Sequence, residues 1–134
     1  MRYLGIDVGR KRIGLALSDK NGLMAFPYQA IVRHLHGDEG VMKIIKEITD
    51  KEGVSRVVAG LPLNLKGEPT KETEEVRSFI ERLQRHIPQP IIFTNEMFST
   101  KLAQRSGNER VDEKAACLIL QGYLDTQQKW CYNE

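Results

Sequence analysis

Two short runs near the start of the chain constrain the fold more than any other feature. In residues 2–8 an aliphatic residue occupies every second position, and the positions between them include Gly5 and Asp7. In residues 12–18 the same alternation leaves one face with only Gly14, Ala16 and Ser18. Because a β-strand has a period of two residues, each run predicts a strand with one aliphatic face and one face of few side chains. We therefore expect another segment to approach the second face closely.

The remaining pattern predicts an ordered series of strands and helices. The first three strands are joined by tight turns and form an antiparallel meander. Asp38 is placed to cap the first helix, and Gly53 is placed to end it. Strands are expected at 2–8, 12–18, 24–33, 55–62 and 90–96, and helices at 38–52, 70–87, 99–105 and 112–127. This order predicts an α/β fold: a five-stranded mixed sheet, with three antiparallel strands and then parallel additions, and helices on both faces.

Length and composition limit the classes of protein that the chain can belong to. Its 134 residues predict a single domain spanning 1–134, and its 40% apolar content is that of a globular protein. A net charge of +2 does not by itself indicate a nucleic-acid partner. The sequence has no apolar stretch long enough to predict secretion or a membrane partner. The two cysteines do not have the spacing of a metal site. These features favour a cytoplasmic protein.

Three acidic residues stand at places where active sites form. Asp7 lies at the end of the first strand, Glu96 follows the last strand, and Asp112 opens the last helix. Each also has a plain interpretation: Asp7 as part of a hairpin turn, Glu96 as an exposed loop acid, and Asp112 as a favourable charge at a helix N-terminus. Taken one at a time, the three residues leave both interpretations open.

Together the three acids predict a metal site. If Asp7, Glu96 and Asp112 converge at one end of one sheet face, their charges repel one another unless a cation lies between them. Hard oxygen ligands select Mg²⁺ or Mn²⁺. With two such ions, one lowers the pKa of an attacking water and the other stabilises a leaving oxygen, which is the chemistry of phosphodiester hydrolysis. The hypothesis is therefore a metal-dependent nuclease with these three residues as its catalytic and metal-binding groups.

Several polar residues near these acids are candidates for substrate contact. Asn64 and Lys66 lie in the loop after the fourth strand and suit phosphate or sugar contact, although the loop also needs its glycine and proline for geometry alone. Basic residues of the first hairpin and the last loop could frame a groove or form only a solvated rim. These basic candidates are Arg10, Lys11, Arg12 and Arg110.

Four separated motifs resemble one known family over nearly the whole chain. They are GIDVGRKRIGLALSD at 5–19, AGLPLNLKGEP at 59–69, NEMFSTKLA at 95–103 and VDEKAACLILQGYLD at 111–125. In order and spacing they are similar to the YqgF family, also called RuvX. The resemblance implies an RNase H-like fold related to the RuvC resolvases, and a cytoplasmic nuclease that processes the 5′ end of pre-16S rRNA. It also implies that Asp7, Glu96 and Asp112 bind the metal.

One motif departs from the family pattern. Where the family commonly has Asp-Glu-Arg followed by Ser or Thr, this chain has Asn95, Glu96 and Met97. The expected metal ligand, Glu96, is present. The neutral Asn95 stands where the family has an acidic residue, and the apolar Met97 stands where it has a basic one, so local contacts to phosphate are expected to differ.

Three other functions remain open from the sequence. A Holliday junction resolvase would use the same chemistry on four-way DNA and would need two active sites, and therefore a homodimer, whereas an RNA nuclease could be a monomer or a homodimer. A nucleic-acid-binding protein without catalysis would show salt-sensitive binding that does not depend on metal. A phosphate-binding hairpin of the actin and sugar-kinase type also has an Asp followed by Gly, but its nucleotide is clamped between two domains, and this chain is too short for two.

Overall fold

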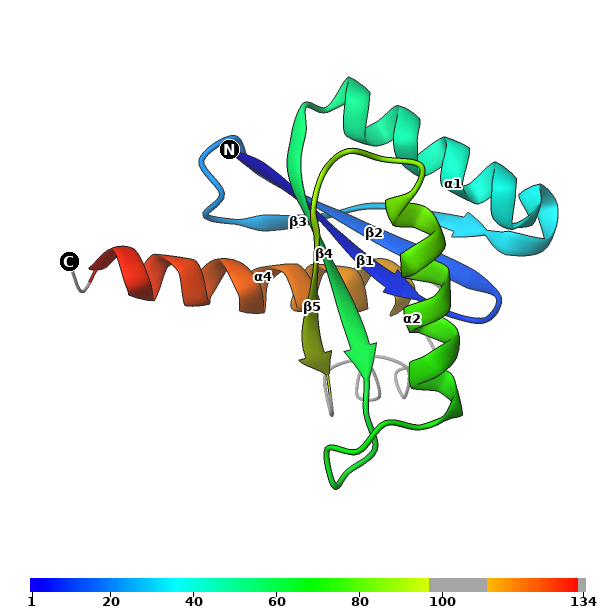
Figure 1. The fold of residues 1–134 in the computed structure, drawn as a ribbon. Coiled ribbons are helices and arrows are strands. Elements are labelled where there is room, and N and C mark those ends of the chain that lie inside the picture. The colour runs from blue at the N-terminus through cyan, green and yellow to red at the C-terminus, as the bar shows by residue number, and fades with distance from the viewer. Residues whose placement is uncertain (97–110, 133–134) are drawn as a thin grey trace.

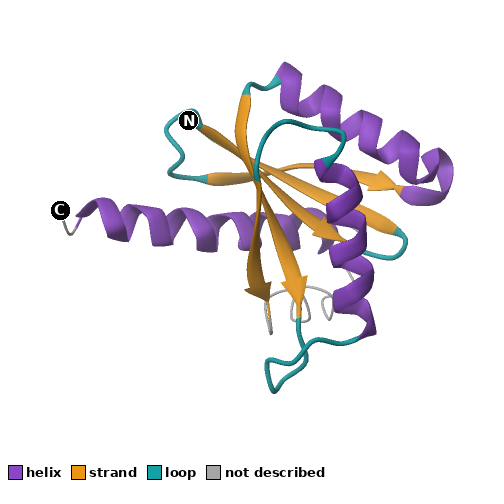
Figure 2. Ribbon diagram, in the orientation of Figure 1, coloured by secondary structure: helices purple, strands orange, loops and turns teal. Residues whose placement is uncertain are grey.

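The computed structural model describes residues 1–96 and 111–132, and within this part the chain forms a five-stranded sheet with helices on both sides (Figure 2). The strands lie in the order β3-β2-β1-β4-β5, with β1, β2 and β3 antiparallel and β4 and β5 added in parallel. Their bounds are β1 Arg2–Val8, β2 Arg12–Ser18, β3 Ala25–Val32, β4 Val54–Pro62 and β5 Ile91–Glu96. The helices are α1 Arg33–Lys51, α2 Lys71–Gln84 and α4 Val111–Tyr132. The predicted sheet is confirmed.

The aliphatic face of the first two strands forms the larger core. Leu4, Ile6 and Val8 of β1 pack with apolar residues of β2 and β4 under helices α1 and α2. Both helices lie on this side of the sheet (Figure 1). The residues that they bury against it are Val41, Met42, Ile45 and Ile48 from α1, and Val76, Phe79, Ile80 and Leu83 from α2.

The opposite face of the sheet, with its small residues, is covered by α4 (Figure 1). A Cβ at Gly5 would lie 2.7 Å from the Cβ of Leu120 and 2.8 Å from the main-chain oxygen of Ala116. Such a distance is too short for two nonbonded atoms, so a side chain at Gly5 would push the helix off the sheet. The close approach predicted from the sequence is therefore made by α4.

Helix α1 joins two helical segments across a break, and the second segment follows Gly37, where the sequence predicts the helix to begin. It begins at Arg33, and Gly37, with φ 69° and ψ 166°, interrupts the helical backbone. Asp38 does not begin the helix as its cap, because its carboxylate instead accepts hydrogen bonds from two arginines, described below. The C-terminal end is as predicted, since the helix ends at Lys51 and Gly53 has φ 63°.

The other helix ends differ from the predictions in length. Thr70 caps α2. The helix ends at Gln84, three residues before the predicted end at Ile87. Helix α4 continues to Tyr132, through a tail for which the sequence predicts no structure. The short helix predicted at 99–105 lies outside the described residues. None of the described helices has the length and apolar character needed to cross a membrane.

Candidate active site

Asp7 lies on the face of β1 that meets α4. Its neighbours along the strand, Ile6 and Val8, point into the core under α1 and α2, so the alternation of the strand turns Asp7 to the other side. The residue is 7% exposed, which is unusual for a carboxylate, and it engages in an interaction of its own with the surrounding protein. Its cross-strand partner in β2 is Gly14. The plain interpretation as a residue of the hairpin turn is wrong, because Asp7 lies within the strand.

The absence of a side chain at Gly14 brings the start of α4 onto the sheet. A Cβ at Gly14 would lie 1.9 Å from the main-chain oxygen of Asp112 and 3.0 Å from its Cα. The first turn of the helix therefore rests on the strand at this point. Because directly opposed residues of an antiparallel pair have Cα atoms about 4.5–5.5 Å apart, Asp112 is placed beside the residue that pairs with Gly14, which is Asp7.

Burial sets the electrostatics of Asp112. Loss of hydration raises the pKa of this carboxyl group, and the positive charge of Arg12 opposes part of the rise. The carboxylate also lies in the first turn of α4, where the helix dipole favours negative charge. The helix-end interpretation and the metal-ligand interpretation are thus compatible, because both need a carboxylate at this place. A cation between Asp7 and Asp112 would compensate the charge that burial penalises.

Glu96 is the last residue of β5, and its side chain lies outside the described part of the structure. Its backbone pairs with Pro62 at the end of β4. The register through Ala59 puts Phe93 in the same row as Ile6, so Glu96 lies two residues further toward the carboxyl edge than Asp7. Two residues correspond to about 7 Å along the strand direction. Because β5 is the second strand from β1, the backbone of Glu96 also lies about 10 Å to the side of that of Asp7.

The structure therefore places the predicted acids unequally. The contact at Gly14 brings the backbone of Asp112 close to the strand position that pairs with Asp7, and the backbone of Glu96 ends at the same edge of the sheet. Among the side chains that the structure describes, which do not include that of Glu96, no three metal-binding groups form a cluster. The three-acid metal site stays a prediction.

A depression beside Asp112 contains three of the six predicted substrate contacts, Arg10, Lys11 and Arg12. It has a volume of about 600 Å³ and is lined by Gly9, Arg10, Lys11, Arg12, Glu72 and Asp112. Glu72 comes from the first turn of α2, and Glu75 one turn later forms an ion pair of 3.6 Å with Arg10. Sequence reasoning did not select these glutamates, because acids in a first helical turn have an ordinary role with the helix dipole.

The loop after β4 is organised by Asn64. Its Oδ1 accepts hydrogen bonds from the backbone N–H groups of Lys66 and Glu68, both at 2.9 Å. The side-chain oxygen of Asn64 thus shapes its own loop, while Lys66 is exposed. Arg110 lies outside the described residues. Contact of Asn64, Lys66 and Arg110 with substrate remains a prediction.

The fold is shared with solved resolvase structures. The chain is similar to a Thermus thermophilus RuvC in complex with a Holliday junction substrate, with a TM-score of 0.61 at 12% identity, over 96% of each chain. It is also similar to a fowlpox virus resolvase in complex with Holliday junction DNA, with a TM-score of 0.58 at 12% identity, over 95% of this chain and 99% of the other. At such low identity the likeness concerns the fold alone. The class defined by the fold is an RNase H-like α/β domain.

Sequence comparison narrows this class to one family. The model of the family described as "RuvX: Holliday junction resolvase" matches residues 1–126. A Sulfurihydrogenibium protein named "Putative pre-16S rRNA nuclease" is 40% identical over 92% of this chain and 90% of its own length. A Clostridium acetobutylicum protein of the same name is 39% identical over 94% and 99%. The chain belongs to the RuvX family, and the predicted enzyme class, a phosphodiester-cleaving hydrolase, is confirmed at this level.

Proposed function

We propose that this protein is a divalent-cation-dependent nuclease that processes the 5′ end of pre-16S rRNA in the cytoplasm. The single observation that supports the proposal is the main-chain contact of Asp112 with Gly14, the partner of Asp7, because it brings the backbones of two of the three predicted acids close together. The names of relatives that are 36–40% identical over nearly their whole length support the RNA substrate.

The residues present suit Mg²⁺ or Mn²⁺. Asp7 and Asp112 offer carboxylate oxygens, which are hard ligands, and no thiolate or imidazole is needed. In this proposal Asp7, Asp112 and Glu96 hold the cation. A bound divalent cation supplies Lewis-acid catalysis at the phosphoryl group and activates water at neutral pH.

The protein's own groups have separate roles in this proposal. The two aspartates place the cation at the carboxyl edge of the central strands, and the burial of Asp7 keeps its carboxylate fixed. Arg12, whose charge acts on Asp112, and the neighbouring Arg10 and Lys11 line the depression where a phosphate would approach. Charge-assisted contacts to phosphate would orient the scissile bond.

Cleavage assays with a matched pair of variants test the proposal. A purified RNA that contains the 5′ leader of pre-16S rRNA is incubated with the protein in EDTA, Mg²⁺ or Mn²⁺. The Asp7→Asn variant is expected to lose cleavage by at least about a hundredfold, since even outer-shell changes at metal sites cost 10–100-fold. Asp50→Asn changes an exposed aspartate on α1 and should cleave like the parent. Equal rates for the parent and Asp7→Asn would refute the proposal.

A second candidate substrate is four-way DNA, which the family description favours. A synthetic junction enters the same assay, and the oligomeric state is measured by sedimentation, because a resolvase must present two active sites. Symmetric nicking of the junction by a dimer, without cleavage of the RNA, would replace the RNA assignment. Salt-sensitive binding to both substrates without cleavage at any Mn²⁺ concentration would instead indicate a binding protein.

A further inference from the structure

Arg33 holds the turn that follows Asp7 through two contacts. Its Nη1 donates to the main-chain oxygen of Gly9 at 2.8 Å, and its backbone N–H donates to the oxygen of Lys11 at 2.9 Å. The turn itself is closed by a hydrogen bond of 2.9 Å from the Gly9 N–H to the Arg12 oxygen. Arg33 therefore contacts both sides of a turn that begins two residues after Asp7 and ends at Arg12.

The break in α1 fixes the guanidinium of Arg33. Its Nη2 donates to Oδ1 of Asp38 at 2.9 Å. In a continuous helix, residues five positions apart do not share a face, since neighbours lie three or four apart. The positive φ of Gly37 turns the backbone between the two residues and allows Asp38 to reach back to Arg33.

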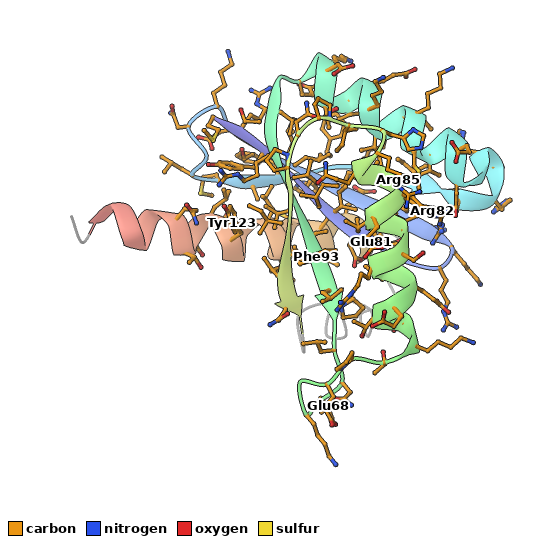
Figure 3. All side chains as sticks on the ribbon, in the orientation of Figure 1. Glu68, Glu81, Arg82, Arg85, Phe93 and Tyr123 are labelled. Carbon is orange, nitrogen blue, oxygen red and sulfur yellow. The ribbon has the colours of Figure 1, made fainter. Side chains whose placement is uncertain are left out.

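Asp38 and Phe79 link this arginine to α2. The second oxygen of Asp38 accepts from Nη2 of Arg82 at 2.9 Å. Both guanidinium groups also lie over the ring of Phe79, at 5.0 Å for Arg33 and 5.8 Å for Arg82. Arg82 lies on the end of α2 that is nearest α1 (Figure 3). The two arginines thus share a carboxylate and a ring, which leaves little freedom to the Arg33 side chain.

We propose that Arg33 is a positioning residue of the nuclease. By holding the turn of residues 9–12 from the side of α1, it fixes Asp7 and Arg12 relative to Asp112, which α4 places on the opposite face of the sheet. The inference rests on the proposed function, since it gives Arg33 a purpose in binding the cation and in catalysis.

Arg82 provides a matched control for a purely structural role. It shares the contacts of Arg33 with Asp38 and Phe79, and within the described residues its hydrogen bonds to side chains reach only Asp38. Arg33→Met and Arg82→Met each keep an unbranched apolar stem and remove one guanidinium. If Arg33 serves only stability, the two variants should behave alike. If it positions the turn, only Arg33→Met should affect the site.

The test combines three readouts on the full chain: cleavage kinetics, Mn²⁺ affinity by titration calorimetry, and amide exchange of Gly9 by NMR. For Arg33→Met we expect kcat to fall about tenfold with KM little changed, as for outer-shell partners of metal sites. Mn²⁺ affinity should fall, and exchange of the Gly9 amide should accelerate as the turn opens locally. Arg82→Met should leave all three unchanged while lowering Tm as much. Arg33→Lys, which keeps a donor for Gly9 or Asp38, should recover part of the activity and serves if Arg33→Met does not fold.

The outcomes separate this inference from the proposed function. Unchanged Gly9 exchange in Arg33→Met, or equal kcat losses in Arg33→Met and Arg82→Met, would overturn the positioning role. If the parent protein cleaves neither RNA nor junction, the proposed function fails, and Mn²⁺ affinity then decides the inference alone. A lower affinity in Arg33→Met than in Arg82→Met would support it, and equal affinities would refute it.

Discussion

Gly14 and Asp112 are in main-chain contact: the space that a Cβ at Gly14 would need is filled by the carbonyl of Asp112, 1.9 Å from that position. A strand residue without a side chain thus sets the height of α4 above the sheet. Because Gly14 pairs with Asp7, the same contact brings the backbone of Asp112 close to the strand position of Asp7.

Gly14→Ala should therefore impair both stability and activity. The added methyl group cannot fit unless the first turn of α4 moves, and overpacking of this kind costs about 1–3 kcal/mol. We expect the free energy of unfolding in urea to fall by about that amount, and RNA cleavage to fall with it because Asp112 is displaced from Asp7.

Gly122→Ala is the matched control on α4. Nothing lies within 4 Å of a Cβ at this exposed position, and alanine is favoured over glycine in a helix. The variant should gain about 0.5–1 kcal/mol and keep its activity. If Gly14→Ala unfolds like the parent, the contact does not determine the position of α4.

Asp112→Asn should stabilise the protein when no divalent cation is bound. Burial raises the pKa of Asp112 above its ordinary value of 3.8, so the folded state binds its proton more tightly than the unfolded state does. The cost of the buried charge therefore appears as pH rises through the raised pKa. In EDTA at pH 7 we expect Asp112→Asn to have the higher Tm, and at pH 3 the two proteins should converge.

Added Mn²⁺ should reverse this order. A cation that binds the folded state raises Tm by mass action, and the parent should gain more than Asp112→Asn because it keeps both aspartates. Equal gains for the two proteins in thermal scans would argue against Asp112 as a ligand.

Asp38→Asn should lose stability in a way that depends on pH. Burial alone would raise the pKa of Asp38, but hydrogen bonds from Arg33 and Arg82 outweigh it and hold the pKa below its ordinary value of 3.8. Stability from this group is present above that value and is lost as pH falls through the lowered pKa. At pH 7 we expect a loss of about 1 kcal/mol, discounted because the pair is partly exposed. The difference in urea unfolding should shrink toward pH 2.

Thr73→Val should detach the end of β4 from α2. Thr73 is fully buried, its hydroxyl group donates to the main-chain oxygen of Pro62, and Oγ1 of Thr73 accepts a hydrogen bond from the Thr70 N–H at 2.8 Å. Valine keeps the shape and leaves both backbone groups without this partner, at a cost of about 1–3 kcal/mol. Thr126→Val, on the exposed side of α4, should change the free energy of unfolding by less than about 0.5 kcal/mol. Similar losses in the two variants would contradict this role of Thr73.

The sequence predicts the sheet and its helices well because the alternation is local. The aliphatic positions of residues 2–8 and the small residues of 12–18 determine which face each helix covers, and the structure agrees. Helix ends are less accessible. Helix α1 includes an additional turn from Arg33, separated by the break at Gly37, and Asp38 after the break binds arginines from two helices, a pairing that no local pattern reveals.

The candidate site was predictable in part for a similar reason. Asp7 is notable because it interrupts an apolar strand, and Asp112 because it opens an apolar helix. The approach of the Asp112 backbone to β2 requires the absence of a side chain at Gly14, and this requirement becomes evident only from the position of the helix on the strand. Arg33 was not selected, because its role depends on contacts with the backbone of a distant turn. The placement of the Glu96 carboxylate remains a prediction.

The packing of α4 against Gly14 is also possible in only one register of β1 and β2. A slip of one residue in β2 would exchange its two faces and put the bulky Ile13 or Leu15 where Gly14 now admits the helix. A misaligned hairpin could then neither seat α4 nor gather the two aspartates. A protein that folds with the wrong register of β1 and β2 would thus be expected to lack the active site altogether, instead of cleaving a different substrate.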